Sequence, residues 1–150
     1  METQQQNAQS RGLVYVVDDQ EIFAEVVAAI LRSEDFETRT FDSAEAAMEQ
    51  IERSAKKPDV LLTDQVMPGM SGMELIIKCR TLVDGLKTIL FSGQVRDDVL
   101  SKYAVKPDKF LGKPFQPAVL LDTIAELQSG TGFRVMPESV PPRNADSPPA

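Results

Sequence analysis

Short apolar segments alternate along the chain with longer segments in which apolar residues recur every three or four positions. The short segments, rich in β-branched residues, predict strands, and the longer ones predict amphipathic helices. Five strands are predicted, over residues 13–17, 36–41, 60–63, 88–91 and 109–111. Five helices are predicted, over residues 22–33, 44–51, 73–80, 95–103 and 117–127. This alternation indicates an α/β fold with a doubly wound, five-stranded parallel sheet covered by helices on both faces.

Local features support these elements. The run 13–17 is apolar without interruption, as expected of a central strand buried on both faces, whereas 36–41 is weaker and predicts an outer strand. In the first helix, Ile22 and Val26 fall on one apolar face together with Ala29 and Ile30. In the next helix, the buried stripe is predicted to comprise Ala44, Ala47, Met48 and Ile51.

Helix and loop boundaries are also visible in the sequence. Either Asp42 or Ser43 can cap the second helix by accepting a backbone N–H hydrogen bond. The Pro and Gly residues of 67–72 predict a loop before the third helix, and Pro117 suits the first turn of the last one.

The composition fits one globular domain. The chain has 150 residues, of which 42% are hydrophobic and 26% charged. Residues 1–11 are polar and rich in Gln, and residues 129–150 are rich in Pro and Ser, so neither end can bury enough surface to offset its ordering entropy. We expect a flexible segment at 1–11, a domain at 12–128 and a disordered tail at 129–150.

Charge and residue usage exclude several functions. A net charge of −7 argues against binding to nucleic acid backbones and to anionic membrane surfaces, because both require an excess of Lys and Arg. The chain has no His, and its single cysteine, Cys79, is expected to serve packing, which argues against disulfides, Cys/His zinc sites and His-based catalysis. No apolar run approaches the roughly 20 residues that span a bilayer, so a cytoplasmic location is expected.

Polar residues end four of the five predicted strands. Asp18 and Asp19 follow the first strand, Asp64 the third, Ser92 the fourth and Lys113 the fifth. Ligands of open parallel sheets bind at this carboxyl edge, so these side chains should gather there. Clustered carboxylates repel one another unless a cation is present, and Mg²⁺ suits carboxylates that share it with phosphate oxygens. The added hydroxyl and ammonium suit a transferring phosphoryl group, with Asp64 as acceptor.

These residues, in this order, resemble the receiver domain of two-component response regulators. The resemblance rests on Asp18-Asp19, Asp64 with Met67-Pro68-Gly69, Phe91-Ser92-Gly93 and Lys113-Pro114-Phe115, and it covers residues 13–127. It implies the flavodoxin-like receiver fold. It also implies that the chain is a phosphoprotein of a phosphorelay, that is, a signalling switch.

The resemblance implies specific roles for the acidic residues. Asp64 is expected to be the phosphoacceptor, supplied by a sensor histidine kinase or a His-containing phosphotransfer protein. Asp18 and Asp19 are expected to hold Mg²⁺ together with Asp64 and the backbone carbonyl of Val66. Of the acidic pair, Asp19 is expected to be the more direct ligand.

Further roles follow from the same resemblance. Ser92 is expected to be the switch hydroxyl, Lys113 to bind the phosphoryl group and Phe110 to be the switch aromatic. The peptide bond between Lys113 and Pro114 is expected to be cis. Val66 and Gln94 occupy the positions that tune dephosphorylation in the family, so no phosphorylated lifetime is predicted.

The expected output is a change in protein binding. Phosphorylation would alter the face formed by the fourth helix and the fifth strand, and hence the affinity for a downstream protein. Lys102, Lys106 and Lys109 in this region fit either a solvated face or a basic docking patch. Apart from its own metal-dependent phosphorylation and dephosphorylation, the chain is not expected to be an enzyme.

Three alternatives are open. The chain could be a receiver fragment of a longer hybrid kinase or response regulator. A phosphatase of the haloacid dehalogenase type also forms an aspartyl-phosphate, but it needs a second Asp where Val66 stands. A flavodoxin-like binding module is disfavoured because Asp18 and Asp19 stand where a cofactor phosphate would need N–H donors.

Overall fold

The structure is a computed structural model of the chain, and it describes residues 10–92 and 103–129. The chain divides into two compact units, residues 1–117 and 118–150, and each is described by itself. Several predictions lie outside the described residues. They concern the terminal segments 1–9 and 130–150, most of the helix 95–103, Gln94 and Lys102.

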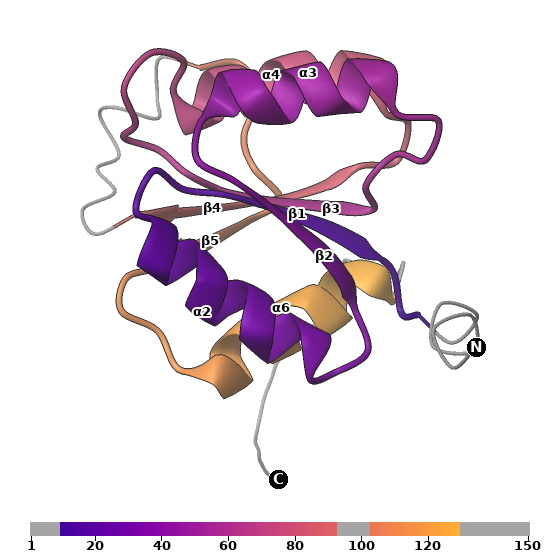
Figure 1. Ribbon diagram of the computed structural model, residues 1–150, viewed down its shortest axis with the longest axis vertical. Coiled ribbons are helices and arrows are strands. Elements are labelled where there is room, and N and C mark those ends of the chain that lie inside the picture. The colour runs from indigo at the N-terminus through magenta and orange to yellow at the C-terminus, as the bar shows by residue number, and fades with distance from the viewer. Residues whose placement is uncertain (1–9, 93–102, 130–150) are drawn as a thin grey trace, which may run out of the picture. The chain divides into compact units, whose positions relative to one another are not determined.

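The first unit contains a parallel sheet in the strand order β2-β1-β3-β4-β5 (Figure 1). The strands are β1 (Leu13–Val17), β2 (Glu37–Phe41), β3 (Val60–Asp64), β4 (Lys87–Ser92) and β5 (Lys109–Gly112). The five predicted strands and their parallel arrangement are thereby confirmed. β2 lies at an edge, as its weak apolar pattern predicted, and all five residues of β1 are buried.

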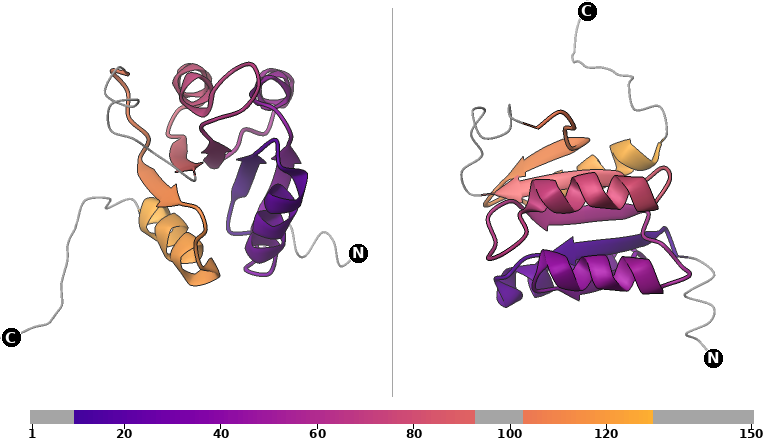
Figure 2. Two further views of the ribbon diagram at one scale, coloured as in Figure 1. Left: turned by 90° about the vertical axis from the view of Figure 1, so that its left-hand side faces the viewer. Right: turned by 90° about the horizontal axis from the view of Figure 1, so that it is seen from above.

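Helices lie on both faces of this sheet. The helices of the first unit are α2 (Glu21–Arg32), α3 (Ala44–Arg53) and α4 (Gly72–Leu82). α3 and α4 lie on one face and α2 on the opposite face (Figure 1; Figure 2). With α6 (Pro117–Gln128), the described residues form four helices where five were predicted over the whole chain. Tyr103, the end of the predicted helix 95–103, lies in no helix.

Side-chain caps begin α3 and α4. Ser43, rather than Asp42, caps α3, because its hydroxyl accepts a hydrogen bond of 3.1 Å from the N–H of Ala46. At α4, Ser71 accepts from the N–H of Glu74 at 3.2 Å, and the Glu74 carboxylate accepts from the N–H of Ser71 at 2.9 Å. These contacts satisfy N–H groups that have no partner inside the helix, so local sequence determines where each helix starts.

The predicted apolar face of α2 was wrong. The buried residues are Ala24, Val27, Ala28 and Leu31. Ile22 is 81% exposed and Val26 is 53% exposed. α2 has apolar residues around most of its circumference, so helical periodicity alone did not identify the face that packs on the sheet. The stripe predicted for α3 was right, with Ala44, Ala47 and Ile51 buried and Met48 packed against them.

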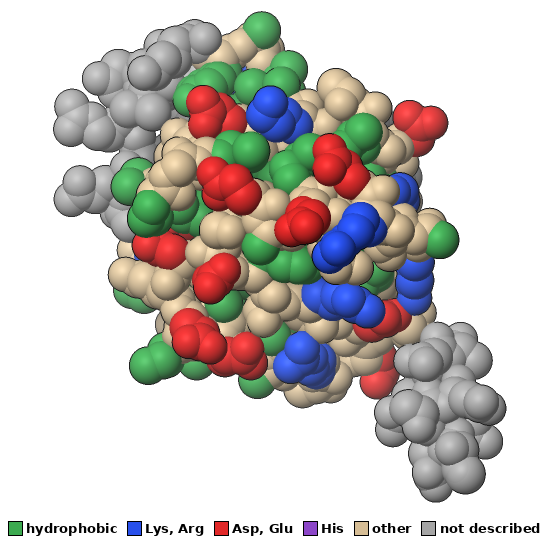
Figure 3. Space-filling view, turned by 45° about the horizontal axis from the view of Figure 1, so that its top comes forward, with side chains coloured by type: hydrophobic (Ala, Val, Ile, Leu, Met, Phe, Trp, Pro, Cys, Tyr) green, Lys and Arg blue, Asp and Glu red, His purple; other side chains and the backbone are tan. Residues whose placement is uncertain are grey.

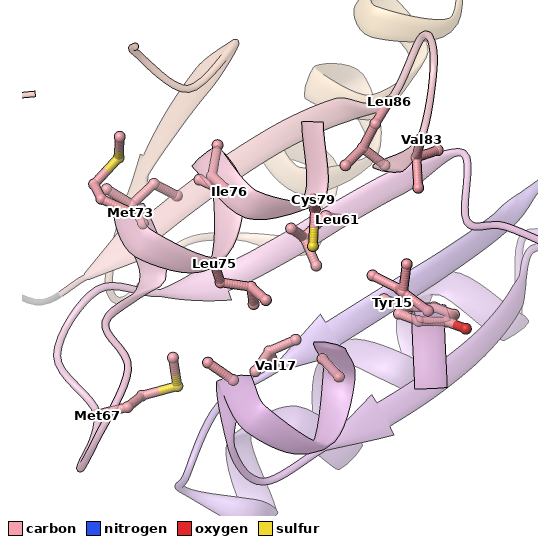
Figure 4. Close-up of a cluster of buried hydrophobic side chains, with 14 of the residues drawn as sticks. Tyr15, Val17, Leu61, Met67, Met73, Leu75, Ile76, Cys79, Val83 and Leu86 are labelled. Atoms are coloured by element: carbon pink, nitrogen blue, oxygen red, sulfur yellow. The ribbon is translucent and has the colours of Figure 1, made fainter. Parts of the chain in front are cut away.

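A hydrophobic core fills the space between the sheet and the helices α3 and α4 (Figure 4). Leu61 from β3 and Leu75 and Ile76 from α4 are fully buried within it. Each such side chain contributes about 1.5–3 kcal/mol on burial. Cys79 lies in the same core, and burial raises its pKa to about 12, so its thiol is a packing group. This core holds β1 and β3 side by side and thereby positions their carboxyl ends.

In α6, Leu120, Ile124 and Leu127 are buried at a spacing that places them on one side of the helix. Pro117 is its first residue, as predicted. No helix in residues 10–92 or 103–129 has both the length and the apolar character that crossing a membrane requires.

Candidate functional site

The carboxyl ends of β1 and β3 bring three aspartates together. Asp18 and Asp19 follow the last residue of β1, and Asp64 is the last residue of β3. Val17 and Thr63 are paired in the parallel register, so the next residues of both strands emerge side by side. One carboxylate oxygen from each aspartate lies within 4.8 Å of the others. The predicted gathering of these three residues is what the structure shows.

Lys113 reaches the same place from the segment after β5. Its ammonium lies 2.9 Å from an oxygen of Asp18 and 3.6 Å from an oxygen of Asp64. Its side chain is only 17% exposed, so solvent screens these contacts weakly. The peptide bond between Lys113 and Pro114 is cis, as predicted. Of the predicted site, the structure therefore unites Asp18, Asp19, Asp64 and Lys113.

The surroundings of Asp64 act on its charge in opposite directions. Burial raises the pKa of Asp64, and the Lys113 ammonium lowers it. The carboxylate of Asp18 raises this pKa further, the backbone N–H of Gln65 lowers it, and Asp19 raises it slightly. The net effect is a pKa above the ordinary value, because one ammonium does not balance the burial and the neighbouring carboxylates.

The three carboxylates differ in how many protein donors they already have. Asp18 is fully buried, and its two oxygens accept hydrogen bonds from the N–H of Gln20 and from Lys113, at 2.8 and 2.9 Å. Asp19 is exposed to solvent. Closely spaced carboxylate oxygens are hard ligands, so the pocket fits a divalent cation, and Asp19 and Asp64 offer it the more accessible oxygens.

A tight loop follows Asp64. The N–H of Gly72 donates to the carbonyl of Gln65 at 3.1 Å, and the N–H of Met73 donates to the Gln65 side chain at 2.9 Å. A Cβ at Gly72 would overlap the carbonyl oxygen of Asp64, so the loop can close this tightly only with glycine there. Val66 lies in this loop and is 73% exposed. The metal contact of its carbonyl stays a prediction.

The two predicted switch residues lie on the neighbouring strands. Ser92 is the last residue of β4, opposite Gly112 of β5, which places its backbone at the same carboxyl edge. Its side chain lies outside the described part of the structure. Phe110, in β5, is 45% exposed. The switching roles of both residues stay predictions.

An aromatic cluster beside Lys113 was missed by the sequence reasoning. The rings of Phe23, Phe91 and Phe115 contact one another with centroid distances of 5.2–6.1 Å. The Lys113 ammonium lies 4.2 Å from the ring centroid of Phe23 and 5.4 Å from that of Phe91. The three phenylalanines come from distant parts of the sequence. Only the adjacency of Phe91 to Ser92 and of Phe115 to Pro114 was a local signal.

Charge is unevenly distributed over the side of the molecule that bears α3 and α4. In Figure 3, acidic side chains are spread over both halves of this view, whereas most of the basic ones lie in the right half. The left side is also where β4 ends in Figure 1. On that side, few basic side chains balance the acidic ones.

Comparisons with known proteins converge on one family. The response regulator receiver domain family matches residues 14–125 of the chain. The heme response regulator HssR of Staphylococcus epidermidis is 32% identical over 109 residues, which are 71% of this chain and 46% of HssR. The chain spans about half the length of the curated relatives that it matches.

Solved structures show the same fold. A CheY-like response regulator receiver domain from Methanospirillum hungatei superposes with a TM-score of 0.71 at 28% identity, covering 80% of this chain and 96% of that one. The receiver domain of the hybrid histidine kinase CckA gives a TM-score of 0.62 at 25% identity, covering 77% and 98% of the two chains. Both matches confirm the predicted five-stranded receiver fold.

Proposed function

Because the chain belongs to the response regulator receiver domain family, we propose that it is a phosphorylation-dependent switch that accepts a phosphoryl group on Asp64. One observation carries this proposal. The oxygens of Asp18, Asp19 and Asp64 lie within 4.8 Å of one another, and Lys113 contacts two of the three residues. Clustered carboxylates repel one another, which raises the free energy of the folded chain. A cation that binds together with the oxygens of a phosphoryl group would relieve this repulsion.

The phosphoryl transfer needs no proton from the protein. An oxygen of the Asp64 carboxylate attacks the phosphorus of the donor, and a new O–P bond forms. The bond between phosphorus and the leaving group breaks, and the leaving group departs with the electron pair. The Lys113 ammonium, 3.6 Å from Asp64, is placed to pair with a phosphoryl oxygen as negative charge builds up there. Asp64 must be ionised to attack, and Lys113 favours that form.

Asp19 and Asp64 are the side chains that we assign to Mg²⁺, with Asp18 supporting them and the Val66 carbonyl as a further ligand. The bound ion would neutralise charge on the phosphoryl oxygens. Asp18 is already bonded to Lys113 and Gln20, so its main task is to orient the ammonium. Ser92 would supply its hydroxyl to the phosphoryl group.

A protein donor has to cover the surface around Asp64. Two large apolar side chains are exposed next to site residues, Ile22 at 81% in the first turn of α2 and Val66 at 73% in the loop after Asp64. Val26, one turn further along α2, is 53% exposed. Exposed apolar side chains beside a polar centre are typical of docking surfaces. We assign these side chains to the surface on which a sensor histidine kinase or a His phosphotransfer protein docks with its phosphohistidine.

The docking surface can be tested separately from the chemistry. Ile22→Asp should slow transfer from a phosphorylated His phosphotransfer protein about tenfold or more, and leave phosphorylation by acetyl phosphate unchanged. Leu82→Asp is the matched control, because Leu82 is exposed at the last residue of α4. Equal transfer rates for Ile22→Asp and Leu82→Asp would remove α2 from the docking surface.

The output would be altered binding of a downstream protein. Phe110 is exposed on β5, within the face expected to change on phosphorylation. The chain would act without nucleic acid or membrane contact, in the cytoplasm, and without turning over a separate substrate. The receiver could equally work as part of a longer hybrid kinase or response regulator, since the matched relatives are about twice as long. A phosphatase function is disfavoured by the exposed, apolar Val66.

The central test uses acetyl phosphate with Mg²⁺ and intact-mass spectrometry. The wild-type chain should gain one phosphoryl group only when the metal is present, and Asp64→Asn should gain none. Asp59→Asn is the matched control, because Asp59 lies at the opposite edge of the sheet and bonds the N–H of Leu13. Phosphorylation of Asp64→Asn at the wild-type rate would overturn the assignment of the acceptor.

A further inference from the structure

The Lys113 ammonium has two kinds of neighbour. Asp18 and Asp64 provide negative charge at 2.9 and 3.6 Å. Phe23 and Phe91 provide aromatic rings, with centroids at 4.2 and 5.4 Å. A cation within about 6 Å of a ring centroid is attracted to the ring quadrupole, and this attraction is strongest where solvent is excluded. Because the Lys113 side chain is only 17% exposed, little solvent weakens its attraction to the two rings.

The rings are held in place by one another. Phe23 meets Phe91 at an interplanar angle of 57° and Phe115 at 81°, and Phe91 meets Phe115 at 63°. Tilted and edge-on contacts are the preferred geometry of aromatic pairs. Phe23 belongs to α2, Phe91 to β4, and Phe115 follows the cis Lys113–Pro114 bond. The cluster thus links three separate segments around one flexible lysine side chain.

This arrangement addresses a problem posed by phosphoryl transfer. Before transfer, Lys113 is hydrogen-bonded to Asp18. During transfer it has to pair with an oxygen of the phosphoryl group on Asp64. It therefore exchanges the Asp18 carboxylate for a phosphoryl oxygen as its partner. A lysine has several freely rotating bonds and loses considerable rotamer entropy when it is fixed in one position. Ring faces attract the ammonium without directional hydrogen bonds. They can therefore hold it near Asp64 both while it bonds Asp18 and while it bonds a phosphoryl oxygen.

We propose that Phe23 is a positioning residue for phosphoryl transfer, and that its ring holds the Lys113 ammonium beside Asp64. The inference rests on the proposed function, because it assigns to Phe23 a part in phosphorylation of Asp64. Phe23 does not touch the reacting atoms in this role. It acts through Lys113, with Phe91 and Phe115 fixing the position of its ring.

The test compares three variants. Phe23→Leu keeps the apolar bulk but removes the ring, and Phe23→Tyr keeps the ring. Phe36→Leu is the matched control, because Phe36, like Phe23, lies under a cation, with Arg11 at 4.8 Å from its centroid, but outside the site. Phosphorylation by acetyl phosphate with Mg²⁺ should be about 3- to 30-fold slower in Phe23→Leu. It should be near the wild-type rate in Phe23→Tyr and Phe36→Leu.

Two further measurements separate positioning from packing. The ε-methylene protons of Lys113 should show an NMR shift caused by the Phe23 ring, lost in Phe23→Leu and restored in Phe23→Tyr, with no phosphodonor present. The Mg²⁺ dissociation constant should stay within about twofold in all variants, because the assigned ligands are unchanged.

The proposal is overturned if Phe23→Leu reacts as fast as the wild type, or if Phe23→Tyr is as slow as Phe23→Leu. It is also overturned if the Lys113 shift is absent in the wild type. If the wild-type chain itself takes no phosphoryl group, the proposed function fails, and the reaction assigned to Phe23 is lost with it. In that case the Lys113 shift would still report whether the ring contact exists, so the two failures can be told apart.

Discussion

Aspartates lie at both edges of the sheet, but in opposite circumstances. At the amino edge, Asp59 accepts a hydrogen bond of 2.8 Å from the N–H of Leu13, the first residue of β1. Asp108, just before β5, accepts from the N–H and the hydroxyl of Thr88 and from Arg80, at 2.8, 3.1 and 3.2 Å. These carboxylates satisfy donors at the beginnings of neighbouring strands.

At the carboxyl edge, Asp18, Asp19 and Asp64 face one another instead. Only Lys113 offers them a positive charge among the described residues, at 2.9 Å from Asp18 and 3.6 Å from Asp64. Burial and the neighbouring carboxylates keep the pKa of Asp64 raised.

The difference between the edges separates stability from function. A carboxylate that accepts hydrogen bonds from neighbouring strands stabilises the fold, whereas a cluster of carboxylates destabilises it until a cation arrives. Aspartates therefore stabilise the fold at the amino edge of the sheet and destabilise it at the carboxyl edge. Substitutions and ions that act on one edge and not on the other can test this comparison.

The largest expected effect is stabilisation by Mg²⁺ at the carboxyl edge. At a Mg²⁺ concentration a hundred times the dissociation constant, the free energy of unfolding of the wild-type chain should rise by about 2.7 kcal/mol. Urea unfolding with Mg²⁺ and with EDTA measures this rise. Asp19→Asn should lose most of it and Asp108→Asn should keep it. Full stabilisation of Asp19→Asn would place the ion elsewhere.

The next effect concerns the amino edge. Asp108→Ala should lower the free energy of unfolding by about 1–2 kcal/mol, because Thr88 and Arg80 lose their shared acceptor. Asp108→Asn keeps an acceptor and should lose less. Both variants should be phosphorylated at the wild-type rate in the acetyl phosphate assay. A large loss of phosphorylation in a folded Asp108 variant would contradict the separation of the two edges.

A smaller loss is expected at Asp59. Asp59→Ala removes one hydrogen bond to the N–H of Leu13 and should cost about 0.5–1 kcal/mol in urea unfolding. Asp59 is exposed, so water can replace part of what is lost. If Asp59→Ala destabilised the chain more than Asp108→Ala, the number of hydrogen bonds would not explain the ranking.

The smallest expected effect is a gain in stability, in contrast to the losses expected for Asp108→Ala and Asp59→Ala. The pKa of Asp64 is raised in the folded chain, mainly by burial, so folding favours its protonated form. The stability that protonation confers is complete below the unfolded pKa and is lost as the pH rises through the folded pKa. Without Mg²⁺ at neutral pH, Asp64→Asn should therefore melt slightly higher than the wild type. The gain stays small because Lys113 also loses a charged neighbour.

The pH dependence provides the control for this last prediction. The difference in melting temperature between Asp64→Asn and the wild type should shrink as the pH falls and Asp64 becomes protonated. A difference that instead grew towards acid pH would show that ionised Asp64 stabilises the folded chain.

Much of the fold was predictable because its signals are local. The runs of apolar residues identified all five strands, and the serines that cap α3 and α4 lie within four residues of the N–H groups they bond. The buried face of α2 was mispredicted, since Ile22 and Val26 have apolar side chains but are exposed. Which of two apolar sides of a helix is buried depends on the element that packs against it, and the sequence of the helix does not specify that element.

The sequence by itself determined which chemistry was present and on which edge of the sheet it would gather. Carboxylates that directly follow the buried strands β1 and β3 must emerge at the carboxyl edge, because parallel strands end on the same side. Only the tertiary structure decided that Lys113 bonds Asp18, 95 residues away in the chain, and that the Phe23 ring lies beside the Lys113 ammonium. Such contacts depend on strand order, register and side-chain packing, which arise when distant segments meet and have no signature within any one of them.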